Sequence, residues 1–369
     1  MINIPPLLIG LGLGVFLAKV LNKEEKMIDC SKKITSFYNE KVALPESMKK
    51  EMRARRDANR ARLNNSDLIP IGMWSQGSYA MHTMVQTENN DFDIDDGVYF
   101  KKEDLIDRYG IEKTPDEMKR MVKKAVSHHG LKEDPEIKEN CVRVKYEKGY
   151  HIDIPVYRTV NYEQANQYYE LAAAGEWKKS DPRAVTKWFN DAVSKKSPDS
   201  INGQQMRRIV RLLKDLVKRN TGILEKGVSG FIISKLVEEE YEAHENRDDE
   251  ALYYTMKNIH ERLEEDMEVR HPIIDEMLTE GLFDPKITIF KKHLKSALNQ
   301  LDILFETDDP AIAQEAWGDV FQEQNYFSEK VLADSQQNDF EGNLSSQSIW
   351  EKSDSEPPLV DKRGGGRNA

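Results

Sequence analysis

The amino-acid sequence predicts an α+β fold, in which a region of alternating strands and helices is followed by a region made mostly of helices. In the first region, residues 68–160, short apolar segments of strand length alternate with helical patterns. In the second region, residues 161 to about 332, apolar residues recur at helical spacing, with glycines at several expected helix ends. A chain of 369 residues is long enough for two such domains.

The expected elements follow one another along the first region. A helical pattern covers residues 27–63, and a further helix is expected near residues 115–129. The expected strands are the segments PIGMWSQ, DFDIDDGVYF, CVRVKYE and YHIDIPVYR. We therefore predict four parts: an apolar segment (1–26), a strand-and-helix lobe with an N-terminal helix (27–160), a helical lobe (161–333) and a tail (334–369). The tail has few apolar groups to bury, so we expect it to be disordered.

The first part contains IPPLLIGLGLGVFLAKVL, a nearly uncharged run over residues 4–21. A bilayer span needs about 20 apolar residues, so this run is at the lower limit. It lacks the small-residue cleavage site of a signal peptide. Lysines at its end and beyond it would keep the rest of the chain in the cytoplasm. Three interpretations stay open: an anchor in the inner membrane, a buried or interfacial segment, and a start of translation at Met27.

The charge balance restricts the partners of the protein. The chain has 54 basic and 65 acidic residues, a net charge of −11. Extensive nucleic-acid binding depends on many phosphate contacts from Lys and Arg, so we expect no stable nucleic-acid partner, although a local basic groove stays possible. Two cysteines, Cys30 and Cys141, exclude a disulfide scaffold and offer no zinc-binding spacing. We expect a reducing, cytoplasmic compartment.

Acidic side chains cluster in the strand region. The segment DFDIDDG places Asp91, Asp93 and Asp95 on one face of a strand and its apolar residues on the other. Carboxylates two residues apart on a strand repel each other, and a divalent cation relieves that repulsion. Oxygen ligands on a rigid element suit Mg²⁺, which usually takes one or two carboxylates together with substrate phosphates.

A later strand repeats the pattern. In YHIDIPVYR, His151, Asp153 and Pro155 share one face, and the apolar residues between them face the core. A third carboxylate on a neighbouring strand would complete a two-metal site for displacement at phosphorus. A lone pair of aspartates is more often a solvated strand edge. Three carboxylates on two otherwise apolar strands favour the metal site.

Two further features of the sequence are suited to binding phosphate groups. The segment Gln76-Gly77-Ser78-Tyr79 follows an apolar strand, and a Gly-Ser turn that opens a helix offers backbone N–H groups and a hydroxyl. The turn alone is weak evidence, because Gly-Ser turns are common. The second feature is a basic stripe on the expected helix GQQMRRIVRLLKDLVKRN, which can equally be an ordinary solvated face. The stripe consists of Arg207, Arg211, Lys214 and Lys218.

Together these motifs resemble the nucleotidyltransferase superfamily that includes polymerase β, with Gly-Ser, a short spacer, Asp-x-Asp and a later Asp. QGSYAMHTMV, DFDIDDGVYF, HIDIPVY and SDPRAVTKWFND are more narrowly similar to the bacterial cGAS/DncV-like nucleotidyltransferases, and among them to the cyclic GMP–AMP synthases. The resemblance covers roughly residues 66–235. It implies a polymerase-β-like palm with a helical second lobe.

The resemblance also implies roles for particular residues. Asp93, Asp95 and Asp153 would be the catalytic carboxylates and the ligands of two Mg²⁺ ions, for which Mn²⁺ can substitute. Some relatives carry an aromatic residue three positions after the Ser, where this chain has Met81, so the choice of base does not carry over. The residues expected to bind the nucleotide are Gln76, Gly77, Ser78, Arg143, Lys214 and Ser229.

The implied activity is the joining of NTPs (ATP, with GTP or another NTP) into a cyclic oligonucleotide, most simply a cyclic dinucleotide such as cGAMP. In this family such products are second messengers of anti-phage defence that act on a downstream effector. Some relatives are conjugated through the C-terminus by ubiquitin-like machinery, and the end GGGRNA would suit that reaction. Two alternatives are a transferase that adds single nucleotides to RNA or protein, and a degenerate scaffold. The acidic balance argues against the first and the aspartate triad against the second.

Overall fold

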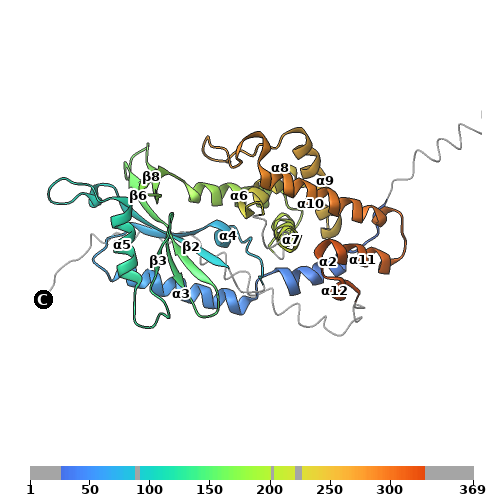
Figure 1. The fold of residues 1–369 in the computed structure, drawn as a ribbon, viewed down its shortest axis with the longest axis horizontal. Coiled ribbons are helices and arrows are strands. Elements are labelled where there is room, and N and C mark those ends of the chain that lie inside the picture. The colour runs from blue at the N-terminus through green and yellow to red at the C-terminus, as the bar shows by residue number, and fades with distance from the viewer. Residues whose placement is uncertain (1–25, 88–91, 201–202, 221–226, 329–369) are drawn as a thin grey trace, which may run out of the picture. The chain divides into compact units, whose positions relative to one another are not determined.

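A computed structural model of the chain describes residues 26–87, 92–200, 203–220 and 227–328 (Figure 1). The predicted apolar segment, the predicted tail and Asp91 lie outside these residues. Among the described residues, no helix is both long enough and apolar enough to cross a membrane.

An eight-stranded mixed sheet forms the first lobe (Figure 1). The long strand β2 pairs antiparallel with β1 and parallel with both β5 and β6. The two parallel pairings have the same offset along the chain, so β5 and β6 are one extended run interrupted at Pro155. The strands are β1 (Gly72–Gln76), β2 (Asp93–Lys101), β3 (Glu136–Ile137), β4 (Val142–Lys145), β5 (His151–Ile154), β6 (Val156–Val160), β7 (Tyr168–Ala173) and β8 (Glu176–Lys179).

The sheet continues beyond residue 160, where the sequence pattern predicted helices. Strands β7 and β8 form an antiparallel hairpin that pairs with β6. Ala174 and Gly175 connect them with positive φ angles of 49° and 81°, the backbone of a tight hairpin turn. The short strand β8 is largely exposed and has no apolar period to reveal it. The helical region therefore begins at Pro182 rather than at residue 161.

Three of the helices begin at a clear helix-start signal in the sequence. α6, α10 and α11 each begin with Asp-Pro, in which the Asp side chain caps the helix and Pro occupies the first turn. The helices are α2 (Ser31–Phe37), α3 (Glu46–Asn64), α4 (Gly77–Ala80), α5 (Pro115–Val126), α6 (Pro182–Lys196), α7 (Gln205–Asn220), α8 (Gly230–Glu240), α9 (Asp248–Glu265), α10 (Pro285–Leu301), α11 (Pro310–Phe321) and α12 (Gln324–Ser328).

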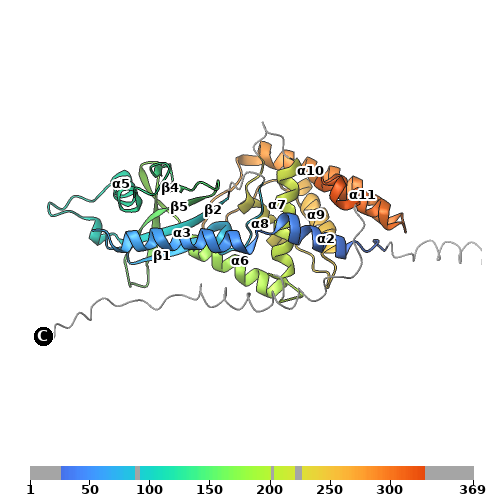
Figure 2. The same cartoon turned by 90° about the horizontal axis from the view of Figure 1, so that it is seen from below.

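Helix α7 is the centre of the second lobe. It contacts α6, α8, α9, α10 and α11, and it is buried over most of its length (Figure 2). Its buried charges are paired: Arg208 with Asp248, and Asp215 with Arg219, each at 2.6 Å. The pairing offsets the cost of removing these charges from water.

The N-terminal helix packs on this helical lobe, whereas the sequence analysis placed it with the strand lobe. Met27, Ile34 and Phe37 belong to the same apolar core as α7 and α9. Phe37 contacts the ring of Phe321 at 4.6 Å between centroids. Helix α3 then extends along the sheet, where it contacts β2 and β5 (Figure 2).

Candidate active site

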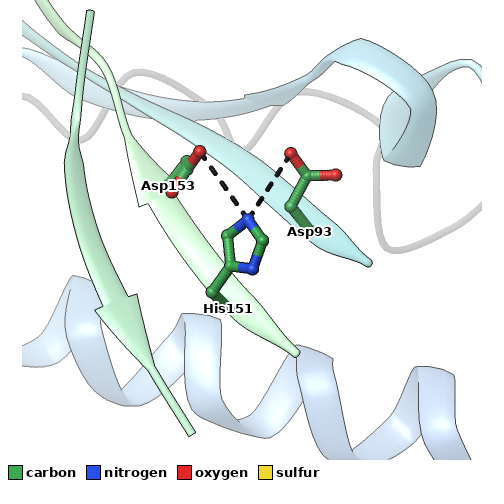
Figure 3. A group of neighbouring side chains, drawn as sticks. All are labelled: Asp93, His151 and Asp153. Carbon is green, nitrogen blue, oxygen red and sulfur yellow. Dashed lines mark ion pairs between the residues drawn. The ribbon is translucent and has the colours of Figure 1, made fainter. Parts of the chain in front are cut away.

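The register of two parallel strands brings the predicted metal ligands together. Asp93 of β2 lies beside His151 of β5, and Asp95 lies beside Asp153. Ligand atoms of Asp93, His151 and Asp153 all lie within 4.8 Å of one another. Figure 3 shows the ring of His151 between the two carboxylates, with Nε2 at 4.0 Å from an oxygen of each. These three groups can hold a metal ion.

Asp95 is set slightly apart from this cluster. It lies between Gln76 of β1 and Asp153 of β5. Its carboxylate abuts Gly77, where an added Cβ would collide with Oδ2 of Asp95. Gly77 also has a left-handed φ of +63°. Only glycine meets both requirements without strain, so the Gly-Ser turn can lie directly against the carboxylate.

The carboxylates are electrostatically crowded. Burial raises the pKa of Asp93, and Asp153 raises it further, while His151 and Arg143 oppose the shift. Burial raises the pKa of Asp95 well above its usual range, and the charges of Asp93 and Asp153 add to the effect. A bound cation would relieve this repulsion, and hard oxygen donors fit Mg²⁺. The residues present therefore fit the expected metal.

Arg143 holds Asp153 in a two-pronged ion pair. Its Nε donates to Oδ1 at 2.8 Å and its Nη2 donates to Oδ2 at 2.7 Å. These hydrogen bonds raise the pKa of Arg143 above its already high value. The family resemblance implied that Arg143 contacts the nucleotide; in the structure it pairs with Asp153, one of the predicted metal ligands.

The fourth aspartate of the motif faces away from the cluster. Asp96 accepts hydrogen bonds from Arg60 of α3, at 2.8 Å from Nε and 2.5 Å from Nη2. The hydroxyl of Ser75 donates to the same carboxylate at 3.1 Å. Asp96 therefore connects β2 to α3 on the far side of the sheet.

A cavity of about 430 Å³ opens beside Asp95. This volume is typical of small-molecule sites. Its lining includes the predicted residues Gln76, Gly77, Ser78 and Lys214, together with Met81 and Thr83. Strand ends supply one side, and helices α7 and α8 supply another.

Lys214 lies half-buried at this cavity. Its Nζ donates to Oγ1 of Thr83 at 2.9 Å and to the carbonyl oxygen of Thr83 at 3.3 Å. Burial lowers the pKa of Lys214 to about 7, and Arg211 lowers it as well, while Asp93 opposes the shift. The ammonium therefore titrates near neutral pH.

The rest of the basic stripe is not one solvated face. Arg211 donates to the hydroxyl of Tyr38, and Arg207 donates to Asn190 at 2.9 Å. Ser229 caps the N-terminus of α8 by accepting from the N–H of Ile232 at 3.2 Å, and it is exposed outside the cavity lining. The structure thus places Lys214 at the cavity, whereas Ser229 lies at the start of α8 and does not line the cavity.

Comparisons with known proteins agree with this geometry. Residues 72–157, from β1 into β6, match the family model of the nucleotidyltransferase domain of DncV-like cyclic GMP–AMP synthases. The chain is similar to the DncV-like nucleotidyltransferases over this stretch. It is 27% identical over 212 residues to a cyclic GMP–AMP synthase of Escherichia albertii; the match covers 55% of this chain and 44% of that protein. The chain thus spans less than half the length of this curated relative.

Solved structures show the same fold. The di-nucleotide cyclase DncV of Vibrio cholerae matches with a TM-score of 0.65 and 18% identity, over 81% of this chain and 97% of that chain. A complex of Vibrio cholerae DncV with the linear intermediate pppA(3′,5′)pG matches with a TM-score of 0.62 and 17% identity, over the same shares. The predicted α+β nucleotidyltransferase fold is confirmed.

Several residues at the cavity were not among the predicted site residues. Tyr157, Ser180 and Asp181 lie in segments that carried the family resemblance, so sequence could have indicated them. Phe231 and His271 also line the cavity. They lie forty positions apart, outside any motif, and only packing of the helical lobe brings them together.

Proposed function

We propose that the protein is a cyclic dinucleotide synthase that joins two NTPs with release of pyrophosphate, with cyclic GMP–AMP as the first candidate product. One observation carries the proposal: Asp95, which lies beside Asp153 in the pairing of β2 with β5, lines a nucleotide-sized cavity together with Gly77, Ser78 and Lys214. Carboxylates beside a phosphate-binding turn are what nucleotidyl transfer requires.

In this proposal Asp93, Asp95 and Asp153 would hold two Mg²⁺ ions, or Mn²⁺ in their place, which would neutralise charge on the phosphates of the donor NTP. A ribose hydroxyl of the acceptor forms a bond to the α-phosphorus of the donor. The bond between the α-phosphorus and the bridging oxygen breaks, and pyrophosphate leaves. One of the carboxylates takes the hydroxyl proton. Positioning and charge neutralisation supply most of the rate in reactions of this type.

The other predicted residues would position the donor. Gly77 and Ser78 would hold its phosphates through backbone N–H groups and a hydroxyl, with Gln76 beside them. Lys214 would supply a cation to the triphosphate, and Ser229 would reach it from the start of α8. Arg143 would act on the acceptor while it orients Asp153. The linear product would then turn over in the same cavity and close with loss of a second pyrophosphate.

The relatives support this order of events. One Vibrio cholerae DncV structure contains a linear pppApG intermediate, and another contains ATP and GTP. By family resemblance we propose that the product is a second messenger of anti-phage defence that acts on an effector. The reaction would take place in the cytoplasm, with the N-terminal segment as a proposed inner-membrane tether.

Product analysis tests the activity. The full chain is incubated with each labelled NTP, singly and in pairs, with Mg²⁺ or Mn²⁺. Mass spectrometry and linkage-specific nucleases then identify the products. A cyclic dinucleotide is expected. Single nucleotides attached to RNA or to protein, without a cyclic product, would contradict the proposal and favour the alternative transferase.

A second proposal concerns residues 364–369, which lie outside the described residues. We propose that ubiquitin-like machinery conjugates the terminal carboxylate. Deletion of these six residues is expected to leave synthesis in vitro unchanged and to abolish covalent adducts and phage protection in cells that carry the native gene neighbours. Adducts that persist after the deletion would contradict this proposal.

A further inference from the structure

His271 makes several hydrogen bonds within the loop between α9 and α10. Its ring atom Nδ1 accepts hydrogen bonds from the backbone N–H groups of Ile273 at 3.1 Å and Ile274 at 3.2 Å. Its own backbone N–H donates to the carbonyl oxygen of Glu276 at 2.9 Å. A ring nitrogen that accepts two hydrogen bonds carries no proton, so the neutral ring has its proton on Nε2.

The same ring lines the cavity that contains Ser78 and Lys214. The Nδ1 edge faces the turn, so the Nε2 edge is the one left for the cavity. Within the described residues this Nε2–H donates to no protein acceptor. Phe231 braces the ring, with 5.4 Å between centroids and 63° between planes.

His271 stays neutral in this position. Burial lowers its pKa, and only Glu276 opposes the shift. Protonation of Nδ1 would also break the hydrogen bonds from Ile273 and Ile274, because the new Nδ1–H would face two other N–H donors. A phosphate group is best matched by a cation, which the cavity already offers at Lys214. A neutral N–H donor beside an aromatic ring is suited instead to a ring acceptor of a nucleobase.

We propose that His271 is a specificity-determining residue that donates its Nε2–H to a ring acceptor of the nucleobase bound in this cavity. The inference rests on the proposed function, in that it takes an NTP to be the ligand. It assigns base recognition to a loop of the helical lobe that no motif marks.

The test uses His271→Asn in the full chain. The Asn side-chain oxygen can accept from the N–H groups two and three positions ahead, which keeps the turn, but the shorter side chain loses the Nε2–H. His128→Asn is the matched control, because His128 Nδ1 also accepts from a backbone N–H, that of Gly130 at 3.0 Å, and does not line the cavity. Melting temperatures verify that both variants fold.

Two measurements are made on each protein. The first is kcat/KM with the four NTPs, with 3-deaza and 7-deaza analogues of ATP and GTP, and with 1-deaza-ATP; each analogue lacks one ring acceptor. The second is the Kd of α,β-methylene ATP and GTP by calorimetry, because their α–β linkage cannot be cleaved. Inhibition by inorganic triphosphate reports separately on the phosphate subsite.

We expect His271→Asn to lower kcat/KM for one base about threefold to tenfold, the usual effect of one neutral hydrogen bond. With one deaza analogue, the kcat/KM of the wild type should fall by the same factor. In His271→Asn, replacing the natural NTP by that analogue should not lower kcat/KM further. Triphosphate inhibition should be unchanged. An equal loss for all four NTPs with weaker triphosphate inhibition would overturn the inference, as would wild-type behaviour. If no product forms, the proposed function fails. The calorimetric Kd still tests the role of His271 in that case, because it measures nucleotide binding without turnover.

Discussion

Asp93 and Asp95 are held close to Asp153 by strand register, and burial, together with the neighbouring negative charges, raises the pKa of both residues. A carboxylate whose folded pKa is raised lowers stability once the pH passes its unfolded value, near 4. At neutral pH these side chains therefore destabilise the metal-free protein. Stabilisation of the fold therefore does not explain why these carboxylates lie together, whereas the proposed metal site does.

We predict that Asp93→Ala with Asp95→Ala abolishes product and leaves the melting temperature unchanged or higher. Mg²⁺ with NTP should raise the melting temperature of the wild type but not of the double variant. The matched control is Glu103→Ala with Asp104→Ala, two exposed acidic residues of a short helical turn in the same lobe. Product formation by the double variant would refute the metal-site assignment.

In the proposed function, Lys214 would make NTP binding sensitive to pH. Its pKa is about 7, so its charged form is present below that pH and lost above it. A triphosphate binds the charged form more strongly, and we predict that the KM for NTP rises as the pH increases from 6 to 8.5. Lys214→Arg should remove this dependence, because a guanidinium stays charged, and Lys214→Ala should raise KM and lower kcat at every pH.

The exposed Lys218, one turn further along α7, provides the control. Lys218→Ala should leave the pH profile of KM unchanged. If Lys214→Arg retains the wild-type profile, another group titrates and the assignment to Lys214 is wrong.

At the scale of elements, the ion pair between Arg60 and Asp96 connects α3 to β2, the strand that carries Asp93 and Asp95. Asp96 is 4% exposed and Arg60 is 26% exposed. Removal of Arg60 alone leaves a buried carboxylate without its charged partner. Breaking a buried pair in this way typically costs about 3 kcal/mol, whereas exposed pairs contribute less than about 1 kcal/mol.

We therefore predict that Arg60→Ala lowers the free energy of unfolding by about 3 kcal/mol, measured by urea denaturation. Arg60→Ala with Asp96→Ala should cost less than the single change, because no charge stays buried. Lys187→Ala is the control, since its pair with Asp191 in α6 is exposed on both sides. A single variant as stable as wild type would show that the pair does not hold α3 on β2.

At the scale of the whole molecule, the start of the described chain belongs to the helical core. Met27 and Cys30 are buried there, and the backbone N–H of Cys30 donates to Asp249 at 2.8 Å. We predict that deletion of residues 1–25 leaves melting temperature and synthesis unchanged, whereas deletion of residues 1–30 lowers both. Fractionation of the full chain in cells tests the membrane tether. Full recovery in the supernatant would rule the tether out.

Sequence alone determined what depends on local patterns and spacing. The alternation in DFDIDDG and HIDIPVY predicted two strands with carboxylates on one face, and the Asp-Pro starts mark helices that the structure contains. The helix expected near residues 115–129 is α5. These features are local because a strand face repeats every two residues and a helix cap involves neighbouring groups.

Tertiary structure decided what depends on packing between distant segments. It brought the face of β5 that carries His151 and Asp153 beside Asp93 of β2, placed Asp96 against α3, and paired Arg143 with Asp153. It also joined β7 and β8 to the sheet and brought His271 beside Phe231 at the cavity. No short-range pattern encodes these contacts, because each depends on which strands pair and how helices meet, and burial of the whole core settles that choice.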